Sequence, residues 1–134
     1  MKVFLDTNVL ASAMLSRGLC HELLEKLILD HEVVLDPPVR QELNRIVRER
    51  FRAPDTLRDW MNRKLDELPQ VRATLHPVPT GIPDPDAGAI IACAWGASAE
   101  LFVTGDKALL ALGNIDGMPI VSPRECWERL FLPK

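Results

Sequence analysis

The chain has 134 residues, of which 47% are hydrophobic and 26% are charged, a balance typical of a folded globular protein. This length fits one folded domain over residues 1–134, because separate hydrophobic cores usually form only in longer chains. With 16 lysines and arginines against 19 aspartates and glutamates, the formal net charge of -3 argues against a strongly basic nucleic-acid coat protein. An excess of acid gathered at one site can still hide a basic surface elsewhere.

Several classes of protein are excluded by what the sequence lacks. No apolar run approaches the roughly 18 residues of a membrane span, and the start MKVFLDTNVL does not have the pattern of a signal peptide. The three cysteines, Cys20, Cys93 and Cys126, form no CxxC pair, which fits neither a disulfide framework nor a thiolate zinc site. The glycine-rich motifs of dinucleotide-binding and P-loop proteins are also missing. We therefore expect a cytoplasmic protein with no membrane segment and no nucleotide cofactor.

The first half of the chain alternates between strand and helix patterns. A short apolar, β-favouring run stops at Asp6, and apolar residues at helical spacing follow it. Further on, Pro38 and Asp55 stand where helices can begin, with Asp55 as a helix N-cap. The predicted strands cover residues 2–5 and 32–35, and further helices cover 21–30, 38–52 and 56–68.

The second half continues the alternation around a proline-rich loop. Residues 71–78 are predicted to form a third strand, and the prolines after it indicate an extended loop. Residues 88–99 are apolar on every side, as expected for a helix buried between layers. The rest is predicted to form a strand over 101–103, a helix to residue 112, a strand over 119–121 and a last helix from Pro123.

Strands that alternate with helices predict an α/β fold, a three-layer α/β/α sandwich with a mainly parallel sheet of four or five strands. In such sheets the working site lies outside the carboxyl ends of the strands. Candidate functional residues are therefore sought directly after each predicted strand.

Acidic residues follow the predicted strands. Asp6 comes directly after the strand over 2–5 and Asp106 soon after the strand over 101–103, so both belong at the carboxyl edge. Glu42 lies beside the apolar stripe of the helix over 38–52. The sequence thus predicts that these three carboxylates approach one another.

A fourth acid is expected from the segment before the apolar helix. Asp84 and Asp86 precede it, where the helix dipole and free backbone N–H groups favour negative charge. If Asp86 is already helical, it lies on the line of Ala89 and Cys93, which favours Asp86 over Asp84. Converging carboxylates repel one another unless a hard divalent cation neutralises them, and oxygen ligands suit Mg²⁺ or Mn²⁺.

Each acid taken alone has an ordinary structural explanation. Asp6 and Asp86 can serve as helix caps, Glu42 can be a solvated helix residue, and Asp106 can be a turn former. Their joint placement at successive strand ends is what favours a metal site.

Four segments resemble the successive motifs of the PIN-domain nucleases, and the likeness is strongest to toxin components of bacterial toxin–antitoxin systems. The segments are LDTNVL at residues 5–10, VRQEL around Glu42, DPDAGAIIACA from Asp84, and VTGDKALL around Asp106. The resemblance implies a sheet order of 3-2-1-4-5, endoribonuclease chemistry, metal-binding roles for Asp6, Glu42 and Asp106, an antitoxin partner and a homodimer. Similar proteins often have an acid where this chain has Gly88, so Asp86, or Asp84, takes that role here.

Basic residues gather on the helix that carries Glu42. Arg45 and Arg48, together with Lys107 beside Asp106, are candidate contacts for RNA phosphates. The alternative is a solvated face laced with acids such as Glu49.

The sequence therefore predicts a metal-dependent endoribonuclease with RNA as its substrate, in which Asp6, Glu42, Asp86 and Asp106 hold Mg²⁺ or Mn²⁺. The bound metal would lower the pKa of a water and stabilise charge on the phosphate oxygens. The alternative is a non-catalytic RNA-binding or protein-interaction domain whose site is degenerate at Gly88.

Overall fold

The computed structural model describes residues 1–68, 82 and 85–132, with the backbone alone for residues 85 and 86. In this part of the chain the strands are β1 (Lys2–Leu5), β2 (Glu32–Val34), β3 (Leu101–Val103), β4 (Asn114–Ile115) and β5 (Met118–Val121). The helices are α1 (Thr7–Leu15), α2 (Leu19–Asp30), α3 (Pro37–Glu49), α4 (Asp55–Asp66), α5 (Pro85–Gly96), α6 (Lys107–Leu112) and α7 (Pro123–Phe131).

The strands form one sheet in the order β2-β1-β3-β5-β4. β1 pairs in parallel with β2 and β3, and β3 pairs in parallel with β5. The mainly parallel α/β fold predicted from the sequence is confirmed. The expected strand over residues 71–78 lies outside the described residues.

A short hairpin between β4 and β5, which the apolar patterns do not predict, closes one edge of the sheet. The two strands are antiparallel, and the residues between them, Asp116 and Gly117, have φ angles of 47° and 89°. A two-residue turn with two positive φ angles matches the twist of the strands that it joins. β4 is too short to show an alternating pattern, so only the Asp-Gly pair could have indicated it.

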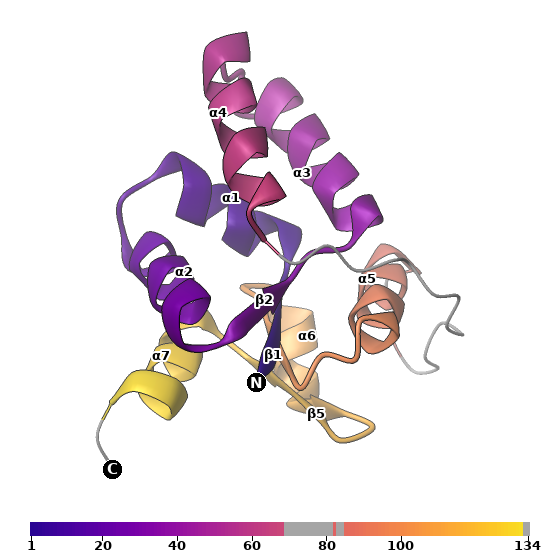
Figure 1. Cartoon of the computed structure of the whole chain (residues 1–134). Coiled ribbons are helices and arrows are strands. Elements are labelled where there is room, and N and C mark those ends of the chain that lie inside the picture. Colours follow the sequence, from indigo (N-terminus) through magenta and orange to yellow (C-terminus); the bar gives the residue numbers. More distant parts are fainter. Residues whose placement is uncertain (69–81, 83–84, 133–134) are drawn as a thin grey trace.

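Helices cover both faces of the sheet. Figure 1 shows α1, α2 and α7 on one face and α5 on the other, with α3 and α4 standing beyond the end of the sheet where β1 finishes. The chain therefore places a helical hairpin over the carboxyl edge. Within the described residues, no helix is both long enough and apolar enough to cross a membrane.

The two central strands are buried along their whole length or nearly so. Phe4 of β1 and Phe102 of β3 are 1% and 0% exposed, and their rings stack with centroids 5.4 Å apart. Strands covered on both faces read as continuous apolar runs, which is why no polar residue interrupts Val3–Leu5 or Leu101–Val103. The first polar residue after each of these strands therefore lies at the carboxyl edge of the sheet.

Several helix boundaries differ from the predicted ones. α5 begins at Pro85, before Gly88, because proline fits the first turn of a helix. α3 ends at Glu49, and Arg52 beyond it has a φ of 50°. Asp55 is the first residue of α4 and forms an ion pair with Arg58 instead of acting as the N-cap.

Candidate functional site

Asp6 lies where β1 ends and α1 begins. Its backbone N–H donates to the carbonyl of Val103 (2.9 Å), which ties it to the end of β3. Its carboxylate accepts from the N–H of Thr7 (2.7 Å) and from the hydroxyl of Thr104 (2.7 Å), and the residue is 7% exposed. Asp6 is thus both the N-cap of α1 and a buried carboxylate at the carboxyl edge.

Thr104 links Asp6 to the second predicted aspartate. It is fully buried, and while its Oγ1 donates to Asp6 Oδ2, the same oxygen accepts from the N–H of Asp106 (3.0 Å). One hydroxyl group therefore links the residue that follows β1 to the N-cap of α6. Thr104 was not among the site residues predicted from the sequence.

Asp106 is the N-cap of α6. Its Oδ1 accepts from the N–H groups of Ala108 (2.8 Å) and Leu109 (3.2 Å), which fixes the orientation of the carboxylate. Its negative charge also reaches Asp6. Burial is the main cause that raises the pKa of Asp6, the charge of Asp106 adds to it, and the hydrogen bonds from Thr104 and Thr7 oppose it.

Glu42 lines a cavity of about 310 Å³ between α3, α5 and the start of α1. Thr7, Val39, Ala89 and Cys93 also line this cavity, so Glu42 faces the same space as the residue that follows Asp6. The carboxylate is held by the guanidinium of Arg45, whose hydrogen bond lowers the pKa of Glu42.

The described side chains do not form a ready-made metal cluster. Among them, no three histidine, cysteine, aspartate or glutamate residues lie close enough together to bind one ion. The structure brings Asp6 and Asp106 together, and it leaves Glu42 in the adjacent cavity. Position 86 lies within the first turn of α5, ahead of the helix predicted over residues 88–99, which meets the condition on which Asp86 was favoured over Asp84. The side chain of Asp86 and all of Asp84 lie outside the described part.

The end of β2 carries another acid, Asp36, which the sequence analysis did not single out as a site residue. It is 1% exposed, and among the described residues its Oδ1 has no hydrogen-bond partner. Burial raises the pKa of Asp36, and a hydrogen bond with the thiol of Cys93 in part opposes this. Burial and the negative charge of Asp36 in turn raise the pKa of Cys93 to about 11. The Oγ1 of Thr7 is likewise buried without a described partner.

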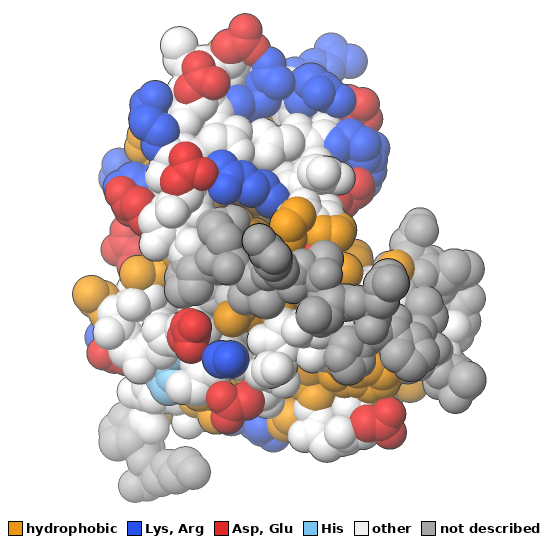
Figure 2. All heavy atoms as spheres, turned by 45° about the vertical axis from the view of Figure 1, so that its right-hand side comes forward, with side chains coloured by type: hydrophobic (Ala, Val, Ile, Leu, Met, Phe, Trp, Pro, Cys, Tyr) orange, Lys and Arg blue, Asp and Glu red, His pale blue; other side chains and the backbone are white. Residues whose placement is uncertain are grey.

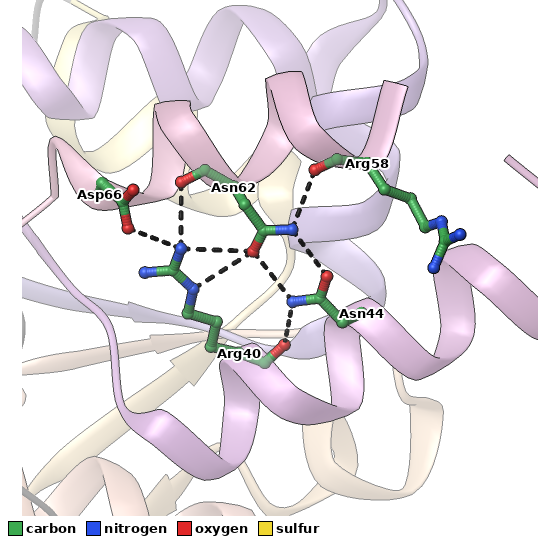
Figure 3. Close-up of polar contacts among 5 residues, drawn as sticks. All are labelled: Arg40, Asn44, Arg58, Asn62 and Asp66. Carbon is green, nitrogen blue, oxygen red and sulfur yellow. Dashed lines mark hydrogen bonds and ion pairs between the residues drawn. The ribbon is translucent and has the colours of Figure 1, made fainter. Parts of the chain in front are cut away.

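A network of polar side chains fixes α3, the helix that carries Glu42, to α4 (Figure 3). Asn44 and Asn62 exchange two hydrogen bonds through their side-chain amides, of 3.1 and 2.8 Å. Arg40 donates to the carbonyl and side-chain oxygens of Asn62 and forms an ion pair with Asp66 (2.6 Å). The position of Glu42 over the carboxyl edge therefore depends on the packing of the two helices.

The arginines of α3 that were predicted to contact phosphates already form ion pairs with glutamates. Arg45 pairs with Glu42 and Glu49, and Arg48 pairs with Glu49 (3.3 Å). In Figure 2, basic and acidic side chains are interspersed over the upper part of the molecule, which α3 and α4 form in Figure 1. This favours the solvated-face interpretation for these arginines. Lys107 is exposed at the first turn of α6.

Two aspartates that follow neighbouring parallel strands, in a sheet covered by helices, place the chain among α/β proteins that work at the carboxyl edge of the sheet. The sequence matches the PIN domain over residues 2–108, and the chain belongs to this family. The resemblance noted from the motifs is therefore confirmed. PIN domains are generally nucleases.

A solved structure supports the same fold. A chain in the crystal structure of VapBC2 from Rickettsia felis, bound to a DNA fragment from their promoter, superposes with a TM-score of 0.65. The two sequences are 15% identical, and the likeness covers 91% of this chain and 98% of that chain. At this identity the similarity concerns the fold alone. No curated protein matches the sequence.

Proposed function

We propose that this protein is a Mg²⁺- or Mn²⁺-dependent endoribonuclease and acts as the toxin of a toxin–antitoxin pair. The proposal rests on two aspartates at the carboxyl edge, where the hydroxyl of Thr104 donates to the carboxylate of Asp6 and accepts from the backbone N–H of Asp106. Membership of the PIN family supports nuclease chemistry at this edge.

The residues at the edge fit a hard divalent cation. Their donor atoms are carboxylate oxygens, and Mg²⁺ is commonly bound through one or two carboxylates, several waters and the phosphates of the substrate. Asp6 is buried and lies near the negative charge of Asp106, so a cation would relieve an unfavourable arrangement. Asp6 and Asp106 would hold the ion, and Glu42 and Asp86 are further proposed ligands. When bound, the metal activates a water and stabilises charge on the phosphate oxygens.

The protein's own groups orient these ligands. Thr104 directs Asp6, and the first backbone amides of α6 direct Asp106, so neither carboxylate has to be ordered when substrate arrives. The cavity beside Thr7 and Glu42 offers room for part of an RNA strand next to the carboxylates. Lys107, exposed next to Asp106, is a proposed phosphate contact.

An antitoxin partner is supported by the fold and by an apolar groove. The similar chain of known structure belongs to a VapBC2 complex. In the present protein, a groove of about 320 Å³ between α1, α2 and α4 is lined by Leu24, Ile28, Leu29 and Trp60, among others. Leu29 is 80% exposed and Ile28 is 49% exposed, so these side chains are available to a protein partner. On the family resemblance we also propose a homodimer and a cytoplasmic location.

A non-catalytic domain is the second candidate. It is favoured by the absence of a three-ligand cluster among the described side chains and by Gly88, which is buried in α5. One experiment distinguishes the two candidate functions. The purified chain, stripped of metal by a chelator, should cleave single-stranded RNA after addition of Mg²⁺ or Mn²⁺ and not before. Binding of RNA without cleavage under any metal condition would favour the non-catalytic domain.

A further inference from the structure

We propose that Arg45 is an internal counter-cation of the site, which holds Glu42 while no metal is bound and turns to Glu49 when a divalent cation engages Glu42. This inference rests on the proposed function. It assigns to Arg45 a role in metal binding that differs from contact with RNA phosphates.

The guanidinium of Arg45 is divided between two acids of the same helix. Its Nε donates to Oε2 of Glu42 (3.0 Å), and one terminal nitrogen contacts Oε1, so both carboxylate oxygens of Glu42 are used. The other terminal nitrogen donates to Oε2 of Glu49 (3.0 Å). Arg45 therefore already touches the acid to which it would move.

The pair lies where an incoming cation would meet it. Glu42 and Arg45 both line the cavity that Thr7 also lines, and Thr7 directly follows Asp6. The guanidinium of Arg45 takes one lone-pair site on each oxygen of Glu42, about half of those that the carboxylate offers, and its positive charge repels a second cation. Arg45 thus occupies the place of a cation at Glu42.

The exchange requires little rearrangement. The side chains of Glu42 and Arg45 are 39% and 50% exposed, and ion pairs of this exposure are weak. Glu49 remains as a partner for Arg45, and the hydrogen bonds between Asn44 and Asn62 keep α3 in place. Only side-chain rotations are needed, and Glu42 is released toward the cavity.

The test measures the affinity of the full-length apo protein for Mn²⁺ by isothermal titration calorimetry. Arg45→Gln should tighten Mn²⁺ binding about two- to fivefold, the range expected when an exposed ion pair is removed. Arg48→Gln is the matched control, because it removes the same charge from the same helix and also loses a contact with Glu49, yet has no bond to Glu42. Glu49→Gln should weaken Mn²⁺ binding, since Arg45 then has only Glu42.

A double-mutant cycle separates a direct effect from a change of net charge. In a Glu42→Gln background, Arg45→Gln should alter Mn²⁺ affinity no more than Arg48→Gln does. Equal effects of the two arginine substitutions in the wild-type background would overturn the role of Arg45. If the wild type binds no Mn²⁺, or if Asp6→Asn leaves its Mn²⁺ affinity unchanged, the proposed function itself fails.

Discussion

At the scale of single residues, the hydroxyl of Thr104 connects the two aspartates of the site. This hydroxyl donates to the carboxylate of Asp6 and accepts from the backbone N–H of Asp106, and the side chain of Thr104 is fully buried. Thr104→Val keeps the shape and removes both hydrogen bonds, so we expect it to destabilise the protein by about 1–3 kcal/mol. It should also weaken Mn²⁺ binding, because Asp6 loses the donor that orients it.

Urea denaturation and calorimetry check both effects of the Thr104 substitution. Thr104→Ser keeps the hydroxyl and is the control, with stability and Mn²⁺ affinity much closer to wild type. A Thr104→Val protein with wild-type Mn²⁺ affinity would show that the link between Asp6 and Asp106 has no role in metal binding.

Asp36 gives a prediction about pH. Burial raises its pKa in the folded protein above the ordinary value of 3.8, so the folded state holds the proton to higher pH than the unfolded chain does. As pH rises above 3.8, stability is lost until the pH has passed the folded-state pKa, so a penalty is present at neutral pH. Asp36→Asn removes this penalty and should raise the Tm at pH 7.

The Tm difference caused by Asp36→Asn should shrink as pH falls toward and below 3.8, where the wild-type carboxyl is neutral in both states. Thermal scans between pH 3 and 8 measure it. Asp59→Asn, on the exposed surface of α4, is the control and should change the Tm little. A gain in Tm that is constant across this range would contradict the charge-burial explanation.

Some of the site residues could be predicted from the sequence, and others could not. Asp6 and Asp106 follow apolar runs that end abruptly, so their place at the carboxyl edge can be derived from the pattern. Thr104 and Asp36 follow strands too, but their roles depend on partners distant in sequence, such as Asp6 for Thr104 and Cys93 for Asp36. The pairing of Arg45 with Glu42 and Glu49 was open to prediction, since residues three and four apart are neighbours on a helix.

At the scale of elements, α3 and α4 act as one unit over the carboxyl edge. The side chain of Asn62 bonds to Asn44 and Arg40, and its loss would remove the hydrogen-bond partners that Asn44 Oδ1 and Arg40 Nε have among the described residues. Asn62→Ala should therefore destabilise the protein by about 1–3 kcal/mol in urea denaturation. Arg63→Ala on the exposed face of α4 should stay within about 0.5 kcal/mol of wild type.

The double variant Asn44→Ala and Asn62→Ala tests whether these two residues act together. Because each amide loses its partner in either single variant, the double variant should cost less than the sum of the two single substitutions. Strict additivity would mean that the two amides do not depend on each other.

Elements with strong periodicity were predictable, and those defined by local turns were not. The strands and helices around the central sheet bury apolar runs or stripes, so their patterns are read directly from the sequence. β4 owes its existence to the turn at Asp116 and Gly117 and to pairing with β5, and neither leaves a periodic signal. The start of α5 at Pro85 reflects the φ angle of proline, which an apolar pattern does not contain.

At the scale of the whole molecule, metal binding and folding are linked through Asp6. This carboxylate is buried, and its pKa is raised by burial and by Asp106, so the charged form destabilises the metal-free protein at neutral pH. Asparagine has nearly the same shape and no charge. Asp6→Asn should therefore raise the Tm of the apo protein at pH 7, with the gain fading as pH falls toward 3.8.

The same substitution should abolish the response of the protein to metal. A ligand that binds only the folded state at 100 times its Kd stabilises it by about 2.7 kcal/mol, which amounts to several degrees in Tm for a chain of this size. Wild-type protein should show this rise with Mn²⁺ and cleave RNA, whereas Asp6→Asn should do neither while remaining folded. Since the apo variant is expected to be the more stable one, loss of activity cannot be attributed to unfolding. Mn²⁺-dependent cleavage at the wild-type rate by Asp6→Asn would remove Asp6, and with it the carboxylate pair, from the proposed mechanism.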